Sequence, residues 1–237
     1  MLTHEQLHRY GRDGFLDVTE PFLSAAEITD ARERIDNLFE RWSTLSSRVR
    51  AGNSDTPPLT ARIFRVTGLD PGIARGQLVK SCQEIAASIV GRRHVWCRFD
   101  AAIYKYPGAG QVLWHQDIAL SMTRMSPHSV HFWIPLNDHD ADSGSMAFIP
   151  GSHLTGRAEH RRAEGGGLQM AADPVFDGNV VSVPLSVGNF SLHGPLTMHK
   201  SNSNGGRGIR KALTLEFSPG PWSAARQLGR PLVRVMG

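Results

Sequence analysis

The chain of 237 residues has little cysteine and no long apolar run. Its two cysteines, Cys82 and Cys97, are too few for a disulfide framework. The apolar stretch at 85–90 is interrupted at Arg92, well before the roughly 18 apolar residues that a membrane helix needs. No charged-then-apolar leader precedes the polar residues near the start of the sequence. We therefore expect a cytoplasmic protein without a membrane span or a structural disulfide.

The chain also lacks a charge imbalance that would define its partner. It has 26 lysines and arginines against 22 aspartates and glutamates, and a pI of about 9.4. Because the arginines are scattered among acidic residues, this balance predicts a mixed-charge surface and no nucleic-acid partner. A chain of this length and composition can bury roughly 70 to 75% of its unfolded surface. It needs no metal merely to fold, so a bound metal would serve chemistry.

The N-terminal part of the sequence carries the signals of helices. Capping-box spacings at Thr3 and Ser24, each followed three residues later by Gln or Glu, predict two helix starts. Asp70 before a proline predicts a third start, and this helix should end at Gly91. Between them, residues 43–62 lose the helical period and gather Ser, Gly, Asn and a Pro-Pro pair, which predicts a long loop.

From residue 94 onward the sequence changes to short runs rich in Val, Ile, Phe, Tyr and Trp, bounded by turn residues. This pattern is typical of an antiparallel sandwich or barrel. The predicted strands are 94–99, 101–106, 112–118, 129–136, 145–149, 179–184, 188–193 and 211–217. We expect a mainly β fold with N-terminal helices around a double-stranded β-helix, the jelly-roll core of cupin-like proteins. The expected organisation is a single domain over 1–237, with a mostly helical lead-in at 1–93, a jelly-roll core at 94–220 and an insertion at 155–178.

One predicted strand carries the triplet His115-Gln116-Asp117. Residues two apart on a strand face the same side, so His115 and Asp117 would present an imidazole and a carboxylate together. Such a triplet is expected about once by chance in this composition, so the metal hypothesis depends on a third ligand. A later segment offers both His193 and His199. Two histidines and one carboxylate leave three adjacent metal positions open, as in non-haem Fe(II) oxygenases.

Several segments occur in a specific order along the chain. They are His4-Glu-Gln-Leu through Gly14-Phe15, Leu23-Ser24, Tyr104-Lys-Tyr-Pro-Gly, His115-Gln-Asp, Trp133-Ile-Pro-Leu-Asn-Asp, Asp142-Ser-Gly-Ser-Met, Ile149-Pro-Gly-Ser-His, and His199 with Asn204 and Arg210. In this combination the sequence resembles the phytanoyl-CoA dioxygenase family of Fe(II)/2-oxoglutarate-dependent oxygenases. The resemblance covers most of the chain.

The resemblance implies a set of site residues. The metal ligands, which are also the catalytic residues, would be His115, Asp117 and His199. Arg210 lies eleven residues after His199 and matches the family's arginine that grips the distal carboxylate of 2-oxoglutarate. Counting the same distance from His193 reaches an asparagine, which cannot form a bidentate guanidinium–carboxylate pair. Two further positions match family contacts to this cosubstrate: Ser201 and Trp133.

The resemblance also implies an activity with Fe(II), 2-oxoglutarate and O2. We expect hydroxylation of an unactivated C–H bond of a small molecule, such as an amino acid or a natural-product intermediate, while 2-oxoglutarate and O2 become succinate and CO2. Asp117 favours hydroxylation over halogenation, because halogenases of the family have a small residue there. Desaturation, epoxidation and cyclisation at the same iron site are alternatives. Alternatives of another class are a zinc hydrolase and a non-catalytic jelly-roll module that binds a small molecule.

Arginines gather in the two long loops, and three of them are candidate substrate contacts: Arg62, Arg157 and Arg161. They motivate the hypothesis of an anionic small-molecule substrate, with a solvated surface as the equally weighted alternative. The remaining histidines, including His131 and His160, are expected to be surface or packing residues. His153 is expected to fix a loop near the site, and His193 to be a core residue or to support a ligand.

Overall fold

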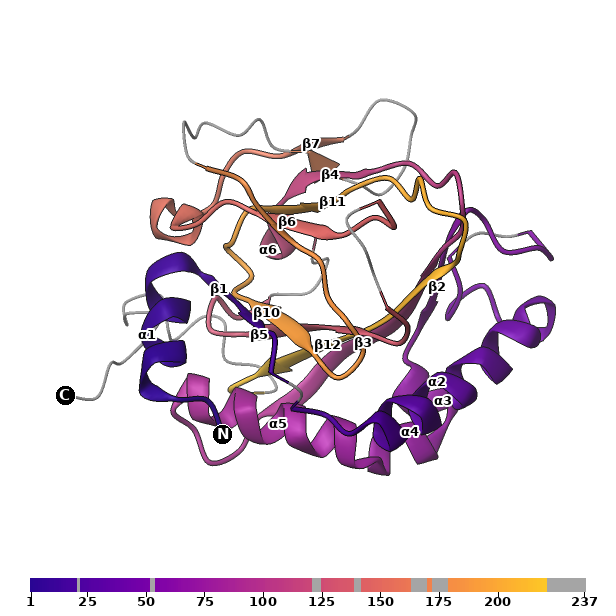
Figure 1. The fold of residues 1–237 in the computed structure, drawn as a ribbon, viewed down its shortest axis with the longest axis horizontal. Coiled ribbons are helices and arrows are strands. Elements are labelled where there is room, and N and C mark those ends of the chain that lie inside the picture. The colour runs from indigo at the N-terminus through magenta and orange to yellow at the C-terminus, as the bar shows by residue number, and fades with distance from the viewer. Residues whose placement is uncertain are drawn as a thin grey trace.

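The protein, described here by a computed structural model, folds into two facing antiparallel sheets with helices on one side (Figure 1). The structure describes residues 1–20, 22–51, 54–120, 125–138, 142–162, 170–171 and 179–220. This is the jelly-roll architecture expected from the sequence. Among the described residues, no helix combines the length and apolar character needed to cross a bilayer.

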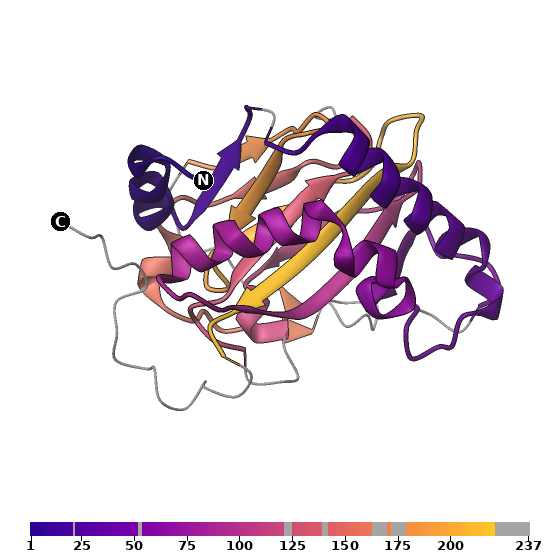
Figure 2. The ribbon, with the colours of Figure 1, turned by 90° about the horizontal axis from the view of Figure 1, so that it is seen from below.

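The two sheets differ in size and in what covers them. The larger sheet has the strand order β1 (Phe15–Val18), β10 (Phe190–His193), β5 (Val130–Pro135), β12 (Arg210–Ser218), β3 (Trp96–Lys105) and β2 (Thr60–Phe64). The smaller sheet has the order β4 (Val112–His115), β11 (His199–Ser201), β6 (Met146–Phe148) and β9 (Val181–Val183). A third pair joins β7 (Arg161–Arg162) to β8 (Met170–Ala171). The helices between residues 25 and 90 lie over the outer face of the larger sheet (Figure 2), and its inner face meets the smaller sheet.

The helices begin and end largely where local chemistry predicts. Both capping boxes form, at Thr3 before α1 (His4–Asp13) and at Ser24 before α2 (Ala25–Glu40). Asp70 caps α4 (Pro71–Arg75), but the predicted third helix is not continuous, because the backbone of Gly76 is extended and a separate helix, α5 (Gln77–Val90), follows. Gly91 ends α5 in the left-handed conformation, as predicted. The short helical elements are η1 (Trp42–Thr44), α3 (Val66–Leu69), α6 (Asp117–Leu120) and η2 (Ser152–Thr155).

Apolar side chains pack between the layers, and most of them belong to two clusters. The larger one joins the buried faces of α2 and α5 to the outer side of the large sheet, where Ile63 and Leu213 are fully buried. The smaller one lies between the sheets and includes Trp133, Phe148 and Ala212. Because strand residues alternate between faces, the neighbours of Ile63 and Leu213 on their strands face the space between the sheets. That space holds the candidate site.

The strand predictions need four corrections. The predicted strands 94–99 and 101–106 form one continuous strand, β3. The lead-in contributes β1 and β2 to the larger sheet, and β11 was not predicted as a strand. The predicted strand 112–118 ends at His115, and Asp117 begins α6 instead. Tertiary pairing decides these cases, since short strands such as β11 have too few residues to show alternation.

The structure describes most of the first predicted loop and part of the second. In the first, Arg50 is buried, donates to the carbonyl of Leu45 at 2.9 Å and lies over the ring of Trp42. This arginine therefore stabilises the loop and does not serve as a free anion contact. Of the predicted insertion 155–178, the residues 163–169 and 172–178 lie outside the described part of the chain.

Candidate active site

The predicted metal ligands meet between the two sheets. His115 on β4 and His199 on β11 are direct cross-strand partners, and their ring centroids lie 4.2 Å apart. One oxygen of Asp117, Oδ1, lies 3.6 Å from Nε2 of His115 and 3.7 Å from Nε2 of His199. The pairing of β4 with β11 therefore places the two histidines, and the turn into α6 brings the carboxylate to them.

The backbone sets the orientation of both imidazoles. Nδ1 of His115 lies 2.7 Å from the carbonyl of Leu113, and Nδ1 of His199 lies 2.9 Å from the carbonyl of Thr197. A carbonyl accepts a hydrogen bond, so each Nδ1 must carry the proton and each Nε2 must present its lone pair toward Asp117. This tautomer is the one that binds a metal through Nε2.

The pKa shifts of the three residues favour the protonation state that a divalent metal requires. Burial, reinforced by a neighbouring histidine in each case, lowers the pKa of His115 to about 3 and that of His199 to about 4. Burial alone would raise the pKa of Asp117, but His131 and His199 hold this pKa well below its usual value. Two neutral imidazoles and an ionised carboxylate fit a divalent metal ion.

A second pair of histidines contacts the other oxygen of Asp117. Nδ1 of His131 lies 2.9 Å and Nε2 of His193 lies 3.0 Å from Oδ2. His131 is therefore not a surface residue, and its ring contacts Asp117 in addition to filling space. The supporting role expected for His193 agrees with this geometry. Alternation along β5 could have revealed His131, because it is two residues before Trp133 and shares its inward face.

The predicted cosubstrate residues form a separate cluster of buried positive charge. The side chain of Arg210 stacks over the ring of Trp133 at 4.7 Å and donates to the carbonyl of Gly144. Lys105, the cross-strand partner of Arg210, is fully buried and donates to Oγ of Ser201 at 3.1 Å. Lys105 was not among the predicted site residues, although a lysine that follows an apolar run within a strand is a signal because buried lysines are rare.

The positive charges in this cluster repel one another. Burial, then the nearby Arg210 and Arg62, lower the pKa of Lys105 to about 7. Burial, then Arg62, lower the pKa of Arg210 to about 9. Nε of Arg210 is buried and has no hydrogen-bond acceptor among the described residues. An anion placed here would relieve the mutual repulsion and the loss of hydration of these groups.

The three arginines proposed for substrate occupy different positions. Arg62 on β2 alternates with the core residue Ile63 and faces the space between the sheets, where it affects the pKa values of Lys105 and Arg210. Arg157 and Arg161 are exposed. Their segment is nonetheless held next to the predicted metal ligands by Gln116. The side-chain amide of Gln116 donates to the carbonyl of Gly156, and its backbone N–H donates to Nε2 of His160.

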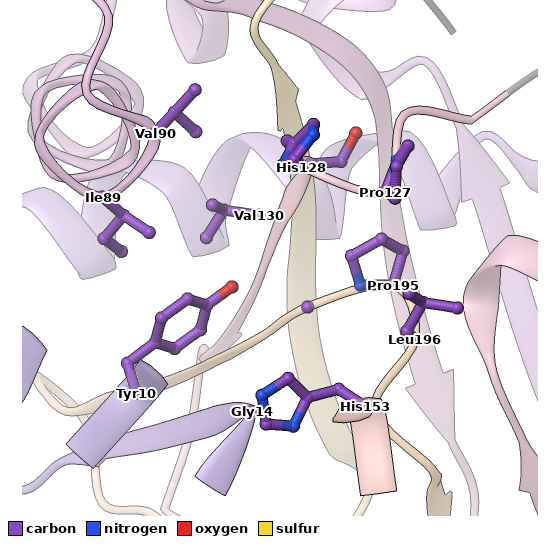
Figure 3. Close-up of a pocket in the computed structure, with 12 residues that line it drawn as sticks. Tyr10, Gly14, Ile89, Val90, Pro127, His128, Val130, His153, Pro195 and Leu196 are labelled. Atoms are coloured by element: carbon purple, nitrogen blue, oxygen red, sulfur yellow. The ribbon is translucent and has the colours of Figure 1, made fainter. Parts of the chain in front are cut away.

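A small pocket lies apart from this site, where α1 meets the β10–β11 connection (Figure 3). Tyr10, Ile89 and Pro195 line it, and its volume of about 20 Å³ holds about one water molecule. His153 also lines this pocket and its Nε2 lies 3.1 Å from the carbonyl of Gly11, so it links η2 to α1. This contact agrees with the expected loop-fixing role of His153.

Comparison with solved structures places the same fold in several other proteins. EvdO2 from Micromonospora carbonacea var. aurantiaca superimposes with a TM-score of 0.77 and 24% identity, covering 94% of this chain and 97% of that one. The carbocyclase SnoK from nogalamycin biosynthesis gives 0.74 and 20%, covering 93% and 88%. EctD from S. alaskensis gives 0.73 and 20%, covering 92% and 77%. At these identities the likeness concerns the fold.

Sequence comparison gives the family. Phytanoyl-CoA dioxygenase domain-containing protein 1 of Rattus norvegicus is 32% identical over 138 residues, 51% of this chain and 46% of the rat protein, so the match spans about half of that relative. The Bos taurus protein of the same name is 26% identical over 264 residues, covering 91% of this chain and 90% of the bovine one. The profile described as Phytanoyl-CoA dioxygenase (PhyH) matches residues 10–212. The chain therefore belongs to the phytanoyl-CoA dioxygenase family, whose members are Fe(II)/2-oxoglutarate-dependent oxygenases.

Proposed function

We propose that this protein is an Fe(II)/2-oxoglutarate-dependent dioxygenase that hydroxylates a small molecule. The observation that carries the proposal is the convergence of two neutral imidazoles, with Nε2 directed to a common point, on one oxygen of an ionised aspartate. A cluster of buried cations next to this triad gives the second requirement, a place for a dicarboxylate.

His115, Asp117 and His199 would hold the iron. Bound Fe(II) supplies the chemistry of O2 activation, coupled to conversion of 2-oxoglutarate into succinate and CO2. The protein's share is to keep both Nε2 lone pairs available through the backbone bonds at Nδ1. It also keeps water away, since both histidines are buried between the sheets.

Arg210, Lys105 and Ser201 would bind the distal carboxylate of 2-oxoglutarate. A guanidinium fixed against Trp133 on one face and held by Gly144 has little further freedom to give up on binding. Lys105 adds a second positive charge from the neighbouring strand. Trp133 would contact the cosubstrate through the edge of the ring that Arg210 leaves free.

The charge of the interior supports an anionic substrate. Burial, then neighbouring positive charge that includes Arg62, lowers the pKa values of Lys105 and Arg210. The two arginines and a protonated Lys105 would carry more positive charge than the single negative charge of one distal carboxylate offsets. Nε of Arg62 is buried and has no hydrogen-bond partner among the described residues. We assign Arg62 to a carboxylate or similar anion of the substrate, and Arg157 and Arg161 to the rim of its path.

Hydroxylation is the reaction we favour for the substrate. A carboxylate at position 117 completes the ligand set, which is the sequence argument against halogenation. Desaturation, epoxidation or cyclisation would be the alternative outcomes at this site. The solved structures of similar fold include a carbocyclase and an epimerase from nogalamycin biosynthesis.

The test is the stoichiometry of turnover. Protein reconstituted anaerobically with Fe(II) and then given O2 and 2-oxoglutarate should form succinate and CO2 in equal amounts, slowly without substrate and faster with it. Loss of this activity in His115→Ala, Asp117→Ala and His199→Ala is expected. Activity that persists in these variants, or that Zn(II) supports, would refute the proposal.

The substrate's anionic character is tested separately. Product screening by mass spectrometry should find a compound that carries a carboxylate, phosphate or sulfate and gains one oxygen. Arg62→Gln should raise the KM for this compound by about tenfold or more, because a buried charge pair is lost. In the same variant the KM for 2-oxoglutarate should change less than about threefold. A preferred substrate without negative charge would contradict this part of the proposal.

A further inference from the structure

The carboxylate of Asp117 lies between histidines from both sheets. His115 and His199 come from the smaller sheet and face Oδ1. His131 and His193 come from the larger sheet, where they are direct partners across β5 and β10, and they face Oδ2. Each carboxylate oxygen is therefore matched to one sheet.

The two pairs meet the carboxylate at different distances. On the Oδ2 side the separations of 2.9 and 3.0 Å are those of hydrogen bonds, so Nδ1 of His131 and Nε2 of His193 donate to that oxygen. On the Oδ1 side the separations of 3.6 and 3.7 Å exceed hydrogen-bond length. The Oδ1 side has the wider spacing that a metal ion between the ligand atoms requires, and the Oδ2 side is already bonded.

Asp117 is the hydrogen-bond partner that accounts for the burial of His131 and His193. Both side chains are buried, and within the described part of the chain the other ring nitrogens, Nε2 of His131 and Nδ1 of His193, have no partner. A buried ring nitrogen without a partner costs stability. An imidazole that only filled space could be replaced by an apolar side chain without that cost.

We propose that His131 and His193 are positioning residues that hold Oδ2 of Asp117, so that this carboxylate meets the metal through Oδ1 alone. A carboxylate free to turn could bind through both oxygens and occupy a position that cosubstrate or O2 needs. The identity of the metal as iron rests on the proposed function, but the positioning role concerns any divalent ion at the triad.

The experiment measures the affinity of the otherwise unchanged protein for Mn(II) by calorimetry, without turnover. His131→Leu and His193→Leu should each weaken binding about 10-fold to 100-fold. The amide nitrogen of asparagine lies where Nδ1 of histidine lies, and that of glutamine lies where Nε2 lies. His131→Asn and His193→Gln should therefore restore affinity, whereas the exchanged variants His131→Gln and His193→Asn should not.

A matched control separates positioning from general stability. His153 is also buried but bonds the carbonyl of Gly11, away from Asp117. His153→Leu should lower the melting temperature of the metal-free protein and leave the affinity for Mn(II) unchanged. Circular dichroism and the metal-free melting temperature show whether each variant folds.

Three results would overturn the proposal. One is unchanged affinity for Mn(II) in folded His131→Leu and His193→Leu variants. Another is equal affinity in the matched and exchanged amide variants, which would assign these residues to packing. A third is two Mn(II) ions per wild-type chain with one lost in His131→Leu, which would make Asp117, His131 and His193 a second metal site. If the rescue pattern appears but 2-oxoglutarate is not turned over, the positioning role stands and the proposed function fails.

Discussion

The two ends of the space between the sheets contrast in how their charges are treated. At the histidine end, the ionised Asp117 is met by imidazoles on both oxygens. At the cation end, Lys105 and Arg210 are buried with Arg62 nearby, and burial, then neighbouring positive charge, lowers the pKa of both. A buried charge without its counterpart is costly, so the cation end is built for an anion that arrives from outside. The histidine end, by contrast, is held in shape by the protein itself.

We expect Asp117→Ala, which disrupts the histidine end, to have the greatest effect. Asp117→Ala removes the acceptor of His131 and His193, which should lower the free energy of unfolding of the metal-free protein by about 1 to 3 kcal/mol. It should also abolish Mn(II) binding in the calorimeter. Urea unfolding measures the first effect. As a matched control, Asp13→Ala removes a surface pair with Arg12 and should cost less than about 1 kcal/mol. Equal destabilisation by the two substitutions would show that the contacts of Asp117 stabilise the metal-free protein no more than a surface ion pair does.

The second prediction concerns a substitution at the cation end. Arg210→Gln should raise the KM for 2-oxoglutarate at least about 30-fold, because a buried charge pair between guanidinium and carboxylate is lost. The affinity for Mn(II) without 2-oxoglutarate should stay unchanged, since Arg210 is not a metal ligand. Steady-state kinetics and calorimetry check the two quantities. Weaker Mn(II) binding by Arg210→Gln in the absence of 2-oxoglutarate would show that the two ends are not separate.

A third prediction concerns the sign of a stability change. Lys105→Met should raise the free energy of unfolding of the ligand-free protein by about 1 to 2 kcal/mol, because burial lowers the pKa of this amine to about 7 and an apolar side chain avoids that cost of removing the amine from water. The control is Lys211→Met, one residue from Arg210 on β12. Lys211 lies 2.6 Å from Asp36 and over the ring of Tyr104, so its loss should destabilise. Destabilisation by Lys105→Met would mean that its charge is already compensated.

The smallest expected effect is a pH dependence of cosubstrate binding. In the free protein the pKa of Lys105 is lowered to about 7, so the amine is largely neutral above that pH. A bound carboxylate favours the charged form, and binding above pH 7 must therefore take up a proton. The affinity for 2-oxoglutarate should fall as pH rises from about 7 to 9, by several-fold. Calorimetry in Lys105→Met should show a flatter profile, and an equally steep one would assign the effect to another group.

The residues predicted as metal ligands lie close together, although the elements that carry them differ from the predicted ones. The jelly-roll class, three helix starts and the approach of Asp117 to both His115 and His199 are all found. The strand expected to carry Asp117 ends two residues earlier, so the meeting of the groups depends on a helix start and not on strand alternation. Spacing survives this difference because a tight turn also keeps residues two apart close together.

The parts that sequence reasoning missed are set by pairing between distant strands. His131 lies opposite His193 and Lys105 opposite Arg210 only because β5 joins β10 and β3 joins β12. Such register comes from the whole sheet and is not visible in a local pattern. Both residues do carry a local signal, a polar side chain beside an apolar run of the same strand.

We propose that the two ends form one site, in which a metal at His115, Asp117 and His199 and a dicarboxylate at Arg210 bind together. The affinity for 2-oxoglutarate under anaerobic conditions, measured with and without Fe(II), tests this proposal. Fe(II) should tighten binding at least about tenfold, and Asp117→Ala should remove this gain, because the cosubstrate contacts both ends only when the metal is held. An affinity for 2-oxoglutarate that is the same with and without Fe(II) would contradict the proposal of a single site.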